Sequence, residues 1–226
     1  MSRDPAAALS SRARGQLQTV LALLAEERAS VSSVVDERAW RVHVLDSLTG
    51  LEVPELSSAA RIADVGAGAG FPGLVLAAAL PCARIDLIES VGRKCEFIRR
   101  AAGAAEVANV EVVNARSEEW AGGEGREAYE AVAARAVGRL STLAELASPL
   151  LKPNGVLVAW KGRRDRDEEQ QLANASEALA MVPEQILDVG DRAGSQHRHL
   201  HVIRKSGPTP ASLPRRPGMA KKRPRG

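Results

Sequence analysis

The spacing of hydrophobic positions changes near residue 61. Before that point, Leu17, Val20, Leu21 and Leu24 recur three and four positions apart, which predicts one apolar helix face over residues 14–28. A second helix is expected over residues 37–48, with Asp36 as its N-cap. One side of it carries Trp40, His43, Val44, Ser47 and Leu48, a mixture unusual for a pure core face. Residues 1–60 are therefore predicted to form an N-terminal helical extension.

From residue 61 onward, short apolar runs alternate with helix-length amphipathic segments. Strands are expected at residues 61–66, 83–89, 110–115, 129–136, 155–162, 184–191 and 197–205, and helices at 72–80, 92–105, 140–151 and 166–182. Such alternation is typical of a parallel sheet covered on both faces by helices. The last two strands predict a closing antiparallel pair joined by a short Gly-Ser turn. The fold class is α/β, with a doubly wound, mostly parallel seven-stranded sheet in a domain over residues 61–205.

The last segment, residues 206–226, differs in composition from the rest. It holds five prolines and no acidic residue, which predicts an extended segment and argues against a packed element. Of the 31 Lys and Arg residues in the chain, six lie among the final twelve, so the 28 acidic residues outnumber the remaining basic ones. A basic tail suits contacts to nucleic-acid phosphates, although a solvated terminus explains the same composition.

The overall composition describes an ordinary globular protein. At 226 residues the length fits one domain with a small extension. Cys82 and Cys95 match neither a redox pair nor a zinc ligand set, which favours a reducing, cytoplasmic compartment. The N-terminus has no signal-peptide core, and no apolar run approaches the roughly 18 residues of a membrane span, so no membrane contact is expected.

Three histidines alternate near the end of the predicted domain. His197, His199 and His201 would share one face of a strand, an arrangement that invites a metal-site interpretation. No carboxylate or cysteine partner accompanies them, so an exposed strand face is the preferred interpretation, and no metal is predicted.

The segment "DVGAGAGFPG", residues 64–73, has the strongest candidate chemistry. Gly66, Gly68 and Gly70 follow a predicted strand, where glycine permits tight turns and close approach of a ligand. A dinucleotide fingerprint would need its third glycine at position 71, which is Phe71. Asp64 at the start of the loop suits a cationic amino-acid ligand better than a pyrophosphate. These features favour S-adenosylmethionine, which carries a sulfonium and an amino acid but no phosphate.

Two further strand ends support an adenosine ligand. Glu89 ends the next strand, 25 residues beyond Asp64, where a carboxylate can accept both ribose hydroxyls. Ser117 and Glu118 follow the third strand, at the height where an adenine ring would lie. Glu89 would serve the ribose of NAD equally well, so it does not by itself separate the two cofactors.

With these residues and Arg135 identified, the chain resembles the small-subunit ribosomal RNA guanine-N(7)-methyltransferase family, also called glucose-inhibited division protein B. The resemblance covers residue 37 to the end. It rests on "HVLDSL", "DVGAGAGFPG", "EFIRRAAG", the "ARA" around Arg135, "LLKPNGVLVAWKG" and "LPRRPGMAKKRP".

The resemblance implies specific roles for these residues. Contacts to S-adenosylmethionine are expected from Gly66, Phe71, Ser117, Glu118 and Arg135, with Glu89 at the ribose. Arg135 is also the candidate catalytic residue, as an orienting group at the end of the fourth strand. The candidate substrate-binding residues are His43, Ser47, Lys161, Arg215, Arg216, Lys221, Lys222 and Arg223. The implied substrate is a guanine of 16S ribosomal RNA or the 30S subunit, and a monomer is expected.

Two rival interpretations remain at this point. A nicotinamide-dependent oxidoreductase would use a similar sheet, and titration with NAD(P)H against S-adenosylmethionine would separate it from a methyltransferase. A non-catalytic RNA-binding or regulatory protein would bind the cofactor without transferring a methyl group. The tail is assigned to RNA alone, so truncation after Leu213 is expected to weaken substrate binding and leave cofactor binding intact.

Overall fold

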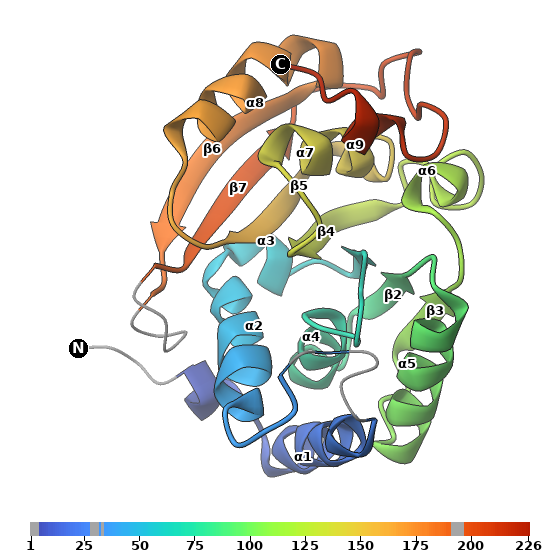
Figure 1. Ribbon diagram of the computed structural model, residues 1–226, viewed down its shortest axis with the longest axis vertical. Coiled ribbons are helices and arrows are strands. Elements are labelled where there is room, and N and C mark those ends of the chain that lie inside the picture. The colour runs from blue at the N-terminus through green and yellow to red at the C-terminus, as the bar shows by residue number, and fades with distance from the viewer. Residues whose placement is uncertain (1–4, 28–31, 33, 191–196) are drawn as a thin grey trace.

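A seven-stranded sheet forms the centre of the computed structural model, which describes residues 5–27, 32, 34–190 and 197–226 (Figure 1). The strand order is β3-β2-β1-β4-β5-β7-β6. The strands are β1 (Arg61–Val65), β2 (Arg84–Ile88), β3 (Val110–Val113), β4 (Tyr129–Arg135), β5 (Leu151–Lys161), β6 (Met181–Asp188) and β7 (His199–Lys205). The predicted α/β class and all seven strands are confirmed, but β6 begins at Met181, inside the helix expected over residues 166–182, so the end of that helix was wrong.

The first five strands are parallel, and β7 runs antiparallel to both of its neighbours, β5 and β6. The expected closing antiparallel pair is therefore present, with β7 inserted between β5 and β6. The Gly-Ser turn assigned to join the pair lies outside the described residues. Because β1 to β5 are parallel, their carboxyl ends meet at one edge of the sheet, where ligands of such folds bind.

Helices cover both faces of the sheet (Figure 1). One face packs against α1 (Ser11–Glu26), α4 (Gly73–Ala79) and α5 (Gly92–Ala104). The other face packs against α6 (Ser117–Trp120), α7 (Leu140–Ala147) and α8 (Arg166–Leu179). The strands carry apolar side chains on both sides, as expected of a parallel sheet that is buried on both faces.

The second N-terminal helix differs from the prediction of one α-helix over residues 37–48. The chain forms a π-helix, η2 (Trp40–Leu45), then a short α2 (Asp46–Leu48) and a 3₁₀ turn, η3 (Thr49–Glu52); a turn η1 (Pro5–Ala8) precedes α1, and α3 (Pro54–Ser57) precedes β1. The Val42 carbonyl accepts a hydrogen bond from Arg135 Nη1 (2.9 Å), and Ser47 Oγ donates to His43 O (2.5 Å). Such side-chain bonds compete with the regular helical ladder, and π-helical turns often accompany functional sites.

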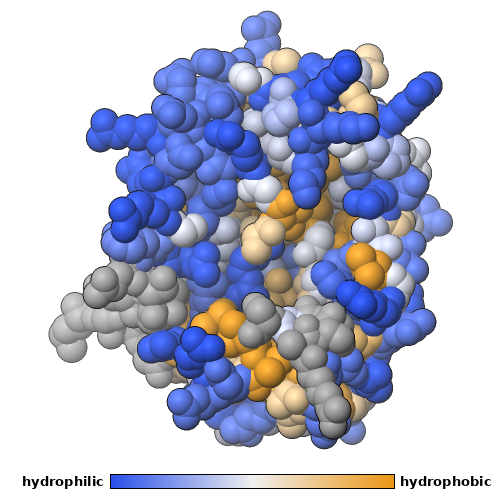
Figure 2. All heavy atoms as spheres, viewed as in Figure 1, coloured by the Kyte–Doolittle hydropathy of each residue, from blue (hydrophilic) through white to orange (hydrophobic). Residues whose placement is uncertain are grey.

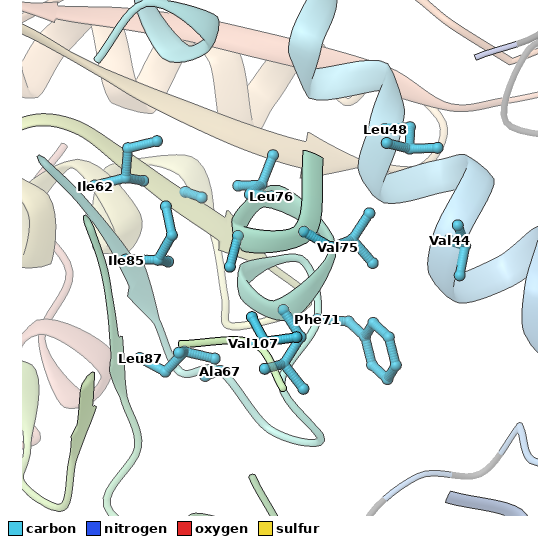
Figure 3. Packing of buried hydrophobic residues seen from close by; sticks show 14 of the residues in the cluster. Val44, Leu48, Ile62, Ala67, Phe71, Val75, Leu76, Ile85, Leu87 and Val107 are labelled. Carbon is cyan, nitrogen blue, oxygen red and sulfur yellow. The ribbon is translucent and has the colours of Figure 1, made fainter. Parts of the chain in front are cut away.

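The extension is joined to the sheet by a shared hydrophobic core. Figure 3 shows Val44 and Leu48 facing Val75 of α4, while Leu76 points toward Ile62 of the sheet. These side chains are almost completely buried, and each such burial contributes about 1.5–3 kcal/mol. Helix α4, which follows the glycine loop, is thereby held between the sheet and the extension.

The tail is packed, contrary to the extended segment that its composition predicted. Its side chains Leu213 and Ala220 are buried, and a short helix, α9 (Met219–Lys222), lies near α7 (Figure 1). Arg215 makes two bonds of 2.5 Å to the Glu145 carboxylate of α7. These contacts span about 70 residues of sequence, so local composition could not reveal them.

Candidate active site

Two neighbouring pockets open at the carboxyl edge of the sheet. The β1–β3 pocket is lined by Gly66, Glu89, Ser117 and Glu118, by the apolar side chains of Val65, Ile88, Val137 and Leu146, and by tail residues. It contains about 690 Å³ of space between protein atoms, with its open mouth included. Figure 2 shows hydrophobic residues near the centre of the viewed face of the molecule, framed by hydrophilic side chains.

The glycine loop begins at the β1–β3 pocket, which Gly66 lines. Gly66, Gly68 and Gly70 have φ angles of +69°, +61° and +92°, in the left-handed region that favours glycine. A β-carbon at Gly66 would lie 2.7 Å from Val137, and one at Gly70 would lie 2.6 Å from Leu74. At Gly68 the nearest atom would be 3.8 Å away, so the backbone there borders open space. The loop can therefore accept a ligand against its main chain.

Glu89 is held rigidly beside that loop. Its Oε2 accepts the Gly68 N–H (3.0 Å) and its Oε1 accepts the Val91 N–H (2.8 Å). A carboxylate has about four acceptor sites, so capacity remains for two ribose hydroxyls. The position at the end of β2 is the one that the sequence predicted for a ribose-binding carboxylate.

Ser117 and Glu118 begin α6, a helix that was not predicted. The Ser117 hydroxyl donates to Glu118 Oε2 (3.3 Å), and Glu118 Oε1 accepts the Gly218 N–H of the tail (2.7 Å). Both residues line the same pocket as Glu89 and Gly66. The structure thus brings together four of the predicted cofactor residues, from three successive strand ends.

Asp64 lies behind the loop, with 1% of its surface exposed, and does not line the pocket. Its Oδ2 accepts the Gly73 N–H (2.8 Å), which ties β1 to the start of α4. Burial raises the pKa of Asp64 to about 7, opposed by the Gly73 bond and by the charge of Arg135. Asp64 therefore positions the loop, and its expected contact with a cationic ligand stays a prediction.

Phe71 and Arg135 lie with His43, away from the β1–β3 pocket. The Phe71 ring stacks on the His43 ring, with centroids 4.5 Å apart, and the Arg135 guanidinium lies 5.8 Å from the Phe71 centroid. Arg135 Nη2 donates to His43 Nδ1 (3.2 Å). Since arginine has no acceptor, His43 carries its proton on Nε2, which donates to Val34 O (2.8 Å).

Arg135 and His43 line the second pocket, the β4–β5 pocket, together with Lys161 and Arg198. Asp46 lies between the two arginines, 3.1 Å from Arg135 Nη1 and 2.8 Å from Arg198 Nε. One carboxylate between two guanidinium groups leaves a net positive charge at this pocket. Burial lowers the pKa of His43, so its ring stays neutral at physiological pH and adds no charge.

The loop between β4 and α7 separates the two pockets. Val137 faces the β1–β3 pocket, whereas Ala136 and Gly138 line the β4–β5 pocket. Ala136 has a φ of +60°, an uncommon conformation for a residue with a side chain, and such strain concentrates at functional sites.

Other candidate substrate residues have different surroundings. Ser47 has no exposed surface, and its hydroxyl bonds within its own helix, so the structure does not bring it to either pocket. Lys161 lines the β4–β5 pocket, and its Nζ donates to Gly138 O (2.9 Å) and to Glu168 Oε1 (2.7 Å).

The six tail cations do not form one uniform surface. Arg215 is bound to Glu145 and to the Arg223 carbonyl (2.8 Å), whereas the side chains of Arg216, Lys221, Lys222 and Arg223 are exposed. Gly218, Ala220 and Lys221 line the β1–β3 pocket. The sequence assigned the tail to RNA alone, but the structure does not separate it from the cofactor region.

The histidine triplet was expected on an exposed strand face, and this prediction was wrong. His201 is buried on β7 and His199 is partly buried, while His197 precedes the strand and is exposed. The reason is that β7 is an interior strand and α8 covers this face, placing Glu168 and Glu169 near His201. Within the described ranges, no cluster of metal-ligating side chains occurs.

Arg198 and Gly218 are candidate residues that sequence reasoning did not select. Arg198 adjoins the histidine triplet, and its partnership with Asp46 spans about 150 residues. Gly218 lies within "LPRRPGMAKKRP", where composition pointed to RNA. Neither residue carries a local pattern that reveals its distant partner.

The residues of the β1–β3 pocket fit S-adenosylmethionine. The pocket combines apolar walls for a purine, the Glu89 carboxylate for a ribose and the backbone of Gly66. Across the part of the chain that the structure describes, no helix is long and apolar enough to cross a membrane.

Solved structures with the same fold include methyltransferases. A SAM-dependent O-methyltransferase from Thermotoga maritima matches with a TM-score of 0.60 and 13% identity, covering 83% of this chain and 71% of that one. A predicted O-methyltransferase from Agrobacterium tumefaciens matches with a TM-score of 0.57 and 26% identity, covering 73% of this chain and 80% of that one.

Relatives found by sequence are more similar to this chain than the two solved structures are. A ribosomal RNA small subunit methyltransferase G from Pelotomaculum thermopropionicum is 37% identical, covering 92% of this chain and 89% of the relative. One from Moorella thermoacetica is 31% identical, covering 99% and 95%. The GidB family model, described as rRNA small subunit methyltransferase G, matches residues 14–200. Since this family model covers most of the chain and the relatives are similar over nearly its whole length, the chain belongs to the GidB family of small-subunit rRNA methyltransferases.

Proposed function

We propose that this protein transfers a methyl group from S-adenosylmethionine to N(7) of a guanine in 16S ribosomal RNA. The observation that carries the proposal is the pair of pockets on opposite sides of residues 136–138. The β1–β3 pocket holds the cofactor, and the β4–β5 pocket receives the guanine. A single chain supplies the residues of both pockets, which supports action as a monomer.

The chemistry demands little from the protein beyond alignment. S-adenosylmethionine, when bound, supplies a methyl group on a positively charged sulfur. Guanine N(7) has a free lone pair on the major-groove edge, so no proton has to be removed before it attacks. The barrier is lowered chiefly by holding the two reactants in line.

The hydrogen bonds of His43 are consistent with a reaction that needs no general base. Its Nδ1 is occupied by Arg135 and its Nε2 by Val34 O. Because burial also lowers its pKa, the ring is suited to fix neighbouring groups and not to accept a substrate proton. We assign His43 to holding Arg135 and Phe71 in place.

The arginines of the β4–β5 pocket can orient the guanine. Arg198 keeps 24% of its side chain exposed, and Arg135 lies deeper, next to Phe71. An arginine that donates to guanine O6 alone leaves the lone pair of N(7), the neighbouring acceptor on the same base edge, free to attack. Arg135 thus remains the principal orienting candidate, with Arg198 as its exposed neighbour.

Exposed cations around the pockets suit the ribosomal RNA backbone. The loops after β3, β4 and β5 carry the exposed arginines Arg116, Arg139 and Arg163, Arg166 begins α8, and the tail adds Arg216, Lys221, Lys222 and Arg223. Lys161 supports this edge through its bond to Gly138 O. Contacts from such side chains give affinity for phosphate that falls as salt rises. Action on ribosomal RNA places the protein in the cytoplasm.

The direct test is transfer of a labelled methyl group to 30S subunits and to protein-free 16S RNA, both from cells lacking this enzyme. Cleavage chemistry specific for N(7)-methylguanine then maps the product. One labelled guanine is the expected result, and comparison of the two substrates identifies the preferred form. Label at another atom, or none despite cofactor binding, would refute the assignment.

A further inference from the structure

Two ion pairs hold the C-terminal tail against the methyltransferase domain, one before Leu213 and one after it. Upstream, the buried Lys205 Nζ donates to Glu127 Oε1 (2.8 Å) and to Thr209 Oγ1 (2.7 Å), and the Thr209 N–H donates to the same Glu127 oxygen (2.8 Å). Downstream, Arg215 is fastened to Glu145. Leu213, between these two ion pairs, is itself buried. The path of the tail is therefore set by buried charges.

Beyond Arg215, the tail reaches the β1–β3 pocket. The Gly218 N–H donates to Glu118 Oε1 (2.7 Å), and Thr142 Oγ1 of α7 donates to Ala220 O (3.3 Å). Gly218, Ala220 and Lys221 line the pocket together with Glu89. The tail thus contacts both a predicted adenosine-binding carboxylate, Glu118, and helix α7.

We infer that residues 213–222 form a closing wall of the cofactor pocket, in which the Gly218 N–H positions the Glu118 carboxylate, so that cofactor binding and tail docking are coupled. The inference rests on S-adenosylmethionine as the ligand of this pocket. Coupling between two events is reciprocal, so the cofactor must stabilise the docked tail as much as the tail improves cofactor affinity. The tail then has two roles. Its pocket-lining residues close the cofactor site, and its exposed cations contact RNA.

Gly218 offers a precise way to disturb this wall. Its φ of +81° is one that residues with a side chain rarely adopt, yet a β-carbon there would meet nothing within 4 Å. Gly218→Ala therefore disfavours the docked backbone without a clash. Gly207→Ala is the matched control, since Gly207 lies in the same tail, has equal space and lacks the positive φ.

The first measurement is calorimetric binding of S-adenosylhomocysteine to the full-length protein and its two variants. We expect Gly218→Ala to weaken binding roughly fivefold or more, from the cost of a left-handed alanine, and Gly207→Ala to bind like the parent. Truncation after Leu213 is expected to weaken binding further. Parent-like affinity in both Gly218→Ala and the truncated chain would overturn the inference.

The second measurement is hydrogen exchange of the parent with and without S-adenosylhomocysteine. Saturating ligand is expected to slow exchange across residues 213–222, and unchanged exchange there would contradict the coupling. If the parent methylates 16S RNA but the variants keep parent-like affinity and the ligand leaves tail exchange unchanged, the inference is wrong and the proposed function stands. If the parent binds no S-adenosylhomocysteine, the proposed cofactor site fails, and the inference fails with it.

Discussion

His201 is the residue whose surroundings differ most from the sequence expectation, and it makes stability depend on pH. Burial lowers its pKa to about 4, against a smaller opposing effect of Glu169 and Glu168. Between pH 6.5 and 4 the unfolded chain takes up a proton that the folded chain does not, so stability falls as pH falls. The full effect is at most roughly 3 kcal/mol.

We therefore expect His201→Leu to remove part of the acid sensitivity. Urea unfolding at pH 7 and pH 5 would show a smaller loss of stability for the variant than for the parent. A parallel loss in both proteins would mean that His201 does not titrate as its burial implies.

Arg135 combines a structural and an orienting role, which two substitutions can separate. Its bonds to Val42 O, Asp46 and His43 are lost in Arg135→Ala, leaving Asp46 with Arg198 alone. We expect a lower melting temperature and a loss of methyl transfer of about 100-fold, as for misplacement of a reactant. Arg135→Lys should regain part of the stability but little of the rate, because lysine lacks the planar fork. The single-turnover rate of methyl transfer and the melting temperature are measured for each variant. A parent-like rate in Arg135→Lys would exclude the orienting role.

At the scale of elements, Trp160 of β5 fastens the N-terminal extension to the sheet. Its Nε1 donates to Asp46 O (2.9 Å), and its ring occupies the space beside Gly50, where a β-carbon would lie 2.4 Å from Cζ2. Gly50→Ala must displace a buried indole, which costs about 1–3 kcal/mol. Gly15→Ala, in α1 with nothing within 4 Å, should instead stabilise by about 0.5–1 kcal/mol.

Denaturant unfolding of the two alanine variants measures this difference. Equal effects would mean that the contact between Trp160 and the extension contributes nothing to stability. Because Asp46 also pairs with Arg135 and Arg198, we expect Gly50→Ala to slow methyl transfer as well.

The sequence could predict the strands and the residues at their ends, but not the contacts between distant side chains. The strands of the parallel sheet were visible because apolar runs that are buried on both faces need no distant information. Gly66 and Glu89 were visible because strand ends bring neighbouring loops together. The pairing of Arg198 with Asp46, the stacking of Phe71 on His43 and the docking of Arg215 on Glu145 join residues far apart in sequence. Such contacts arise from tertiary packing and leave no periodic pattern.

At the scale of the whole molecule, exposed cations gather beside both pockets. Exposed arginines follow β3, β4 and β5 at the carboxyl edge of the sheet, and the tail adds further cations. Lys222 and Arg223 are exposed and do not line the β1–β3 pocket. Their charges are therefore available to RNA, while Gly218, Ala220 and Lys221 are the tail residues that line the cofactor pocket.

Replacing both residues by glutamine should weaken binding to 16S RNA while leaving S-adenosylhomocysteine affinity unchanged. Each lost phosphate contact lowers the slope of log affinity against log salt by about 1, so the slope should fall by up to roughly 2. Lys152→Gln is the control, because Lys152 lies at the start of β5, on the opposite edge, paired with Glu130. Filter binding across a salt series measures the slopes. Equal slopes for the double variant and the parent would mean that these two tail cations do not contact phosphate, and the arginines of the strand-end loops would then account for RNA affinity.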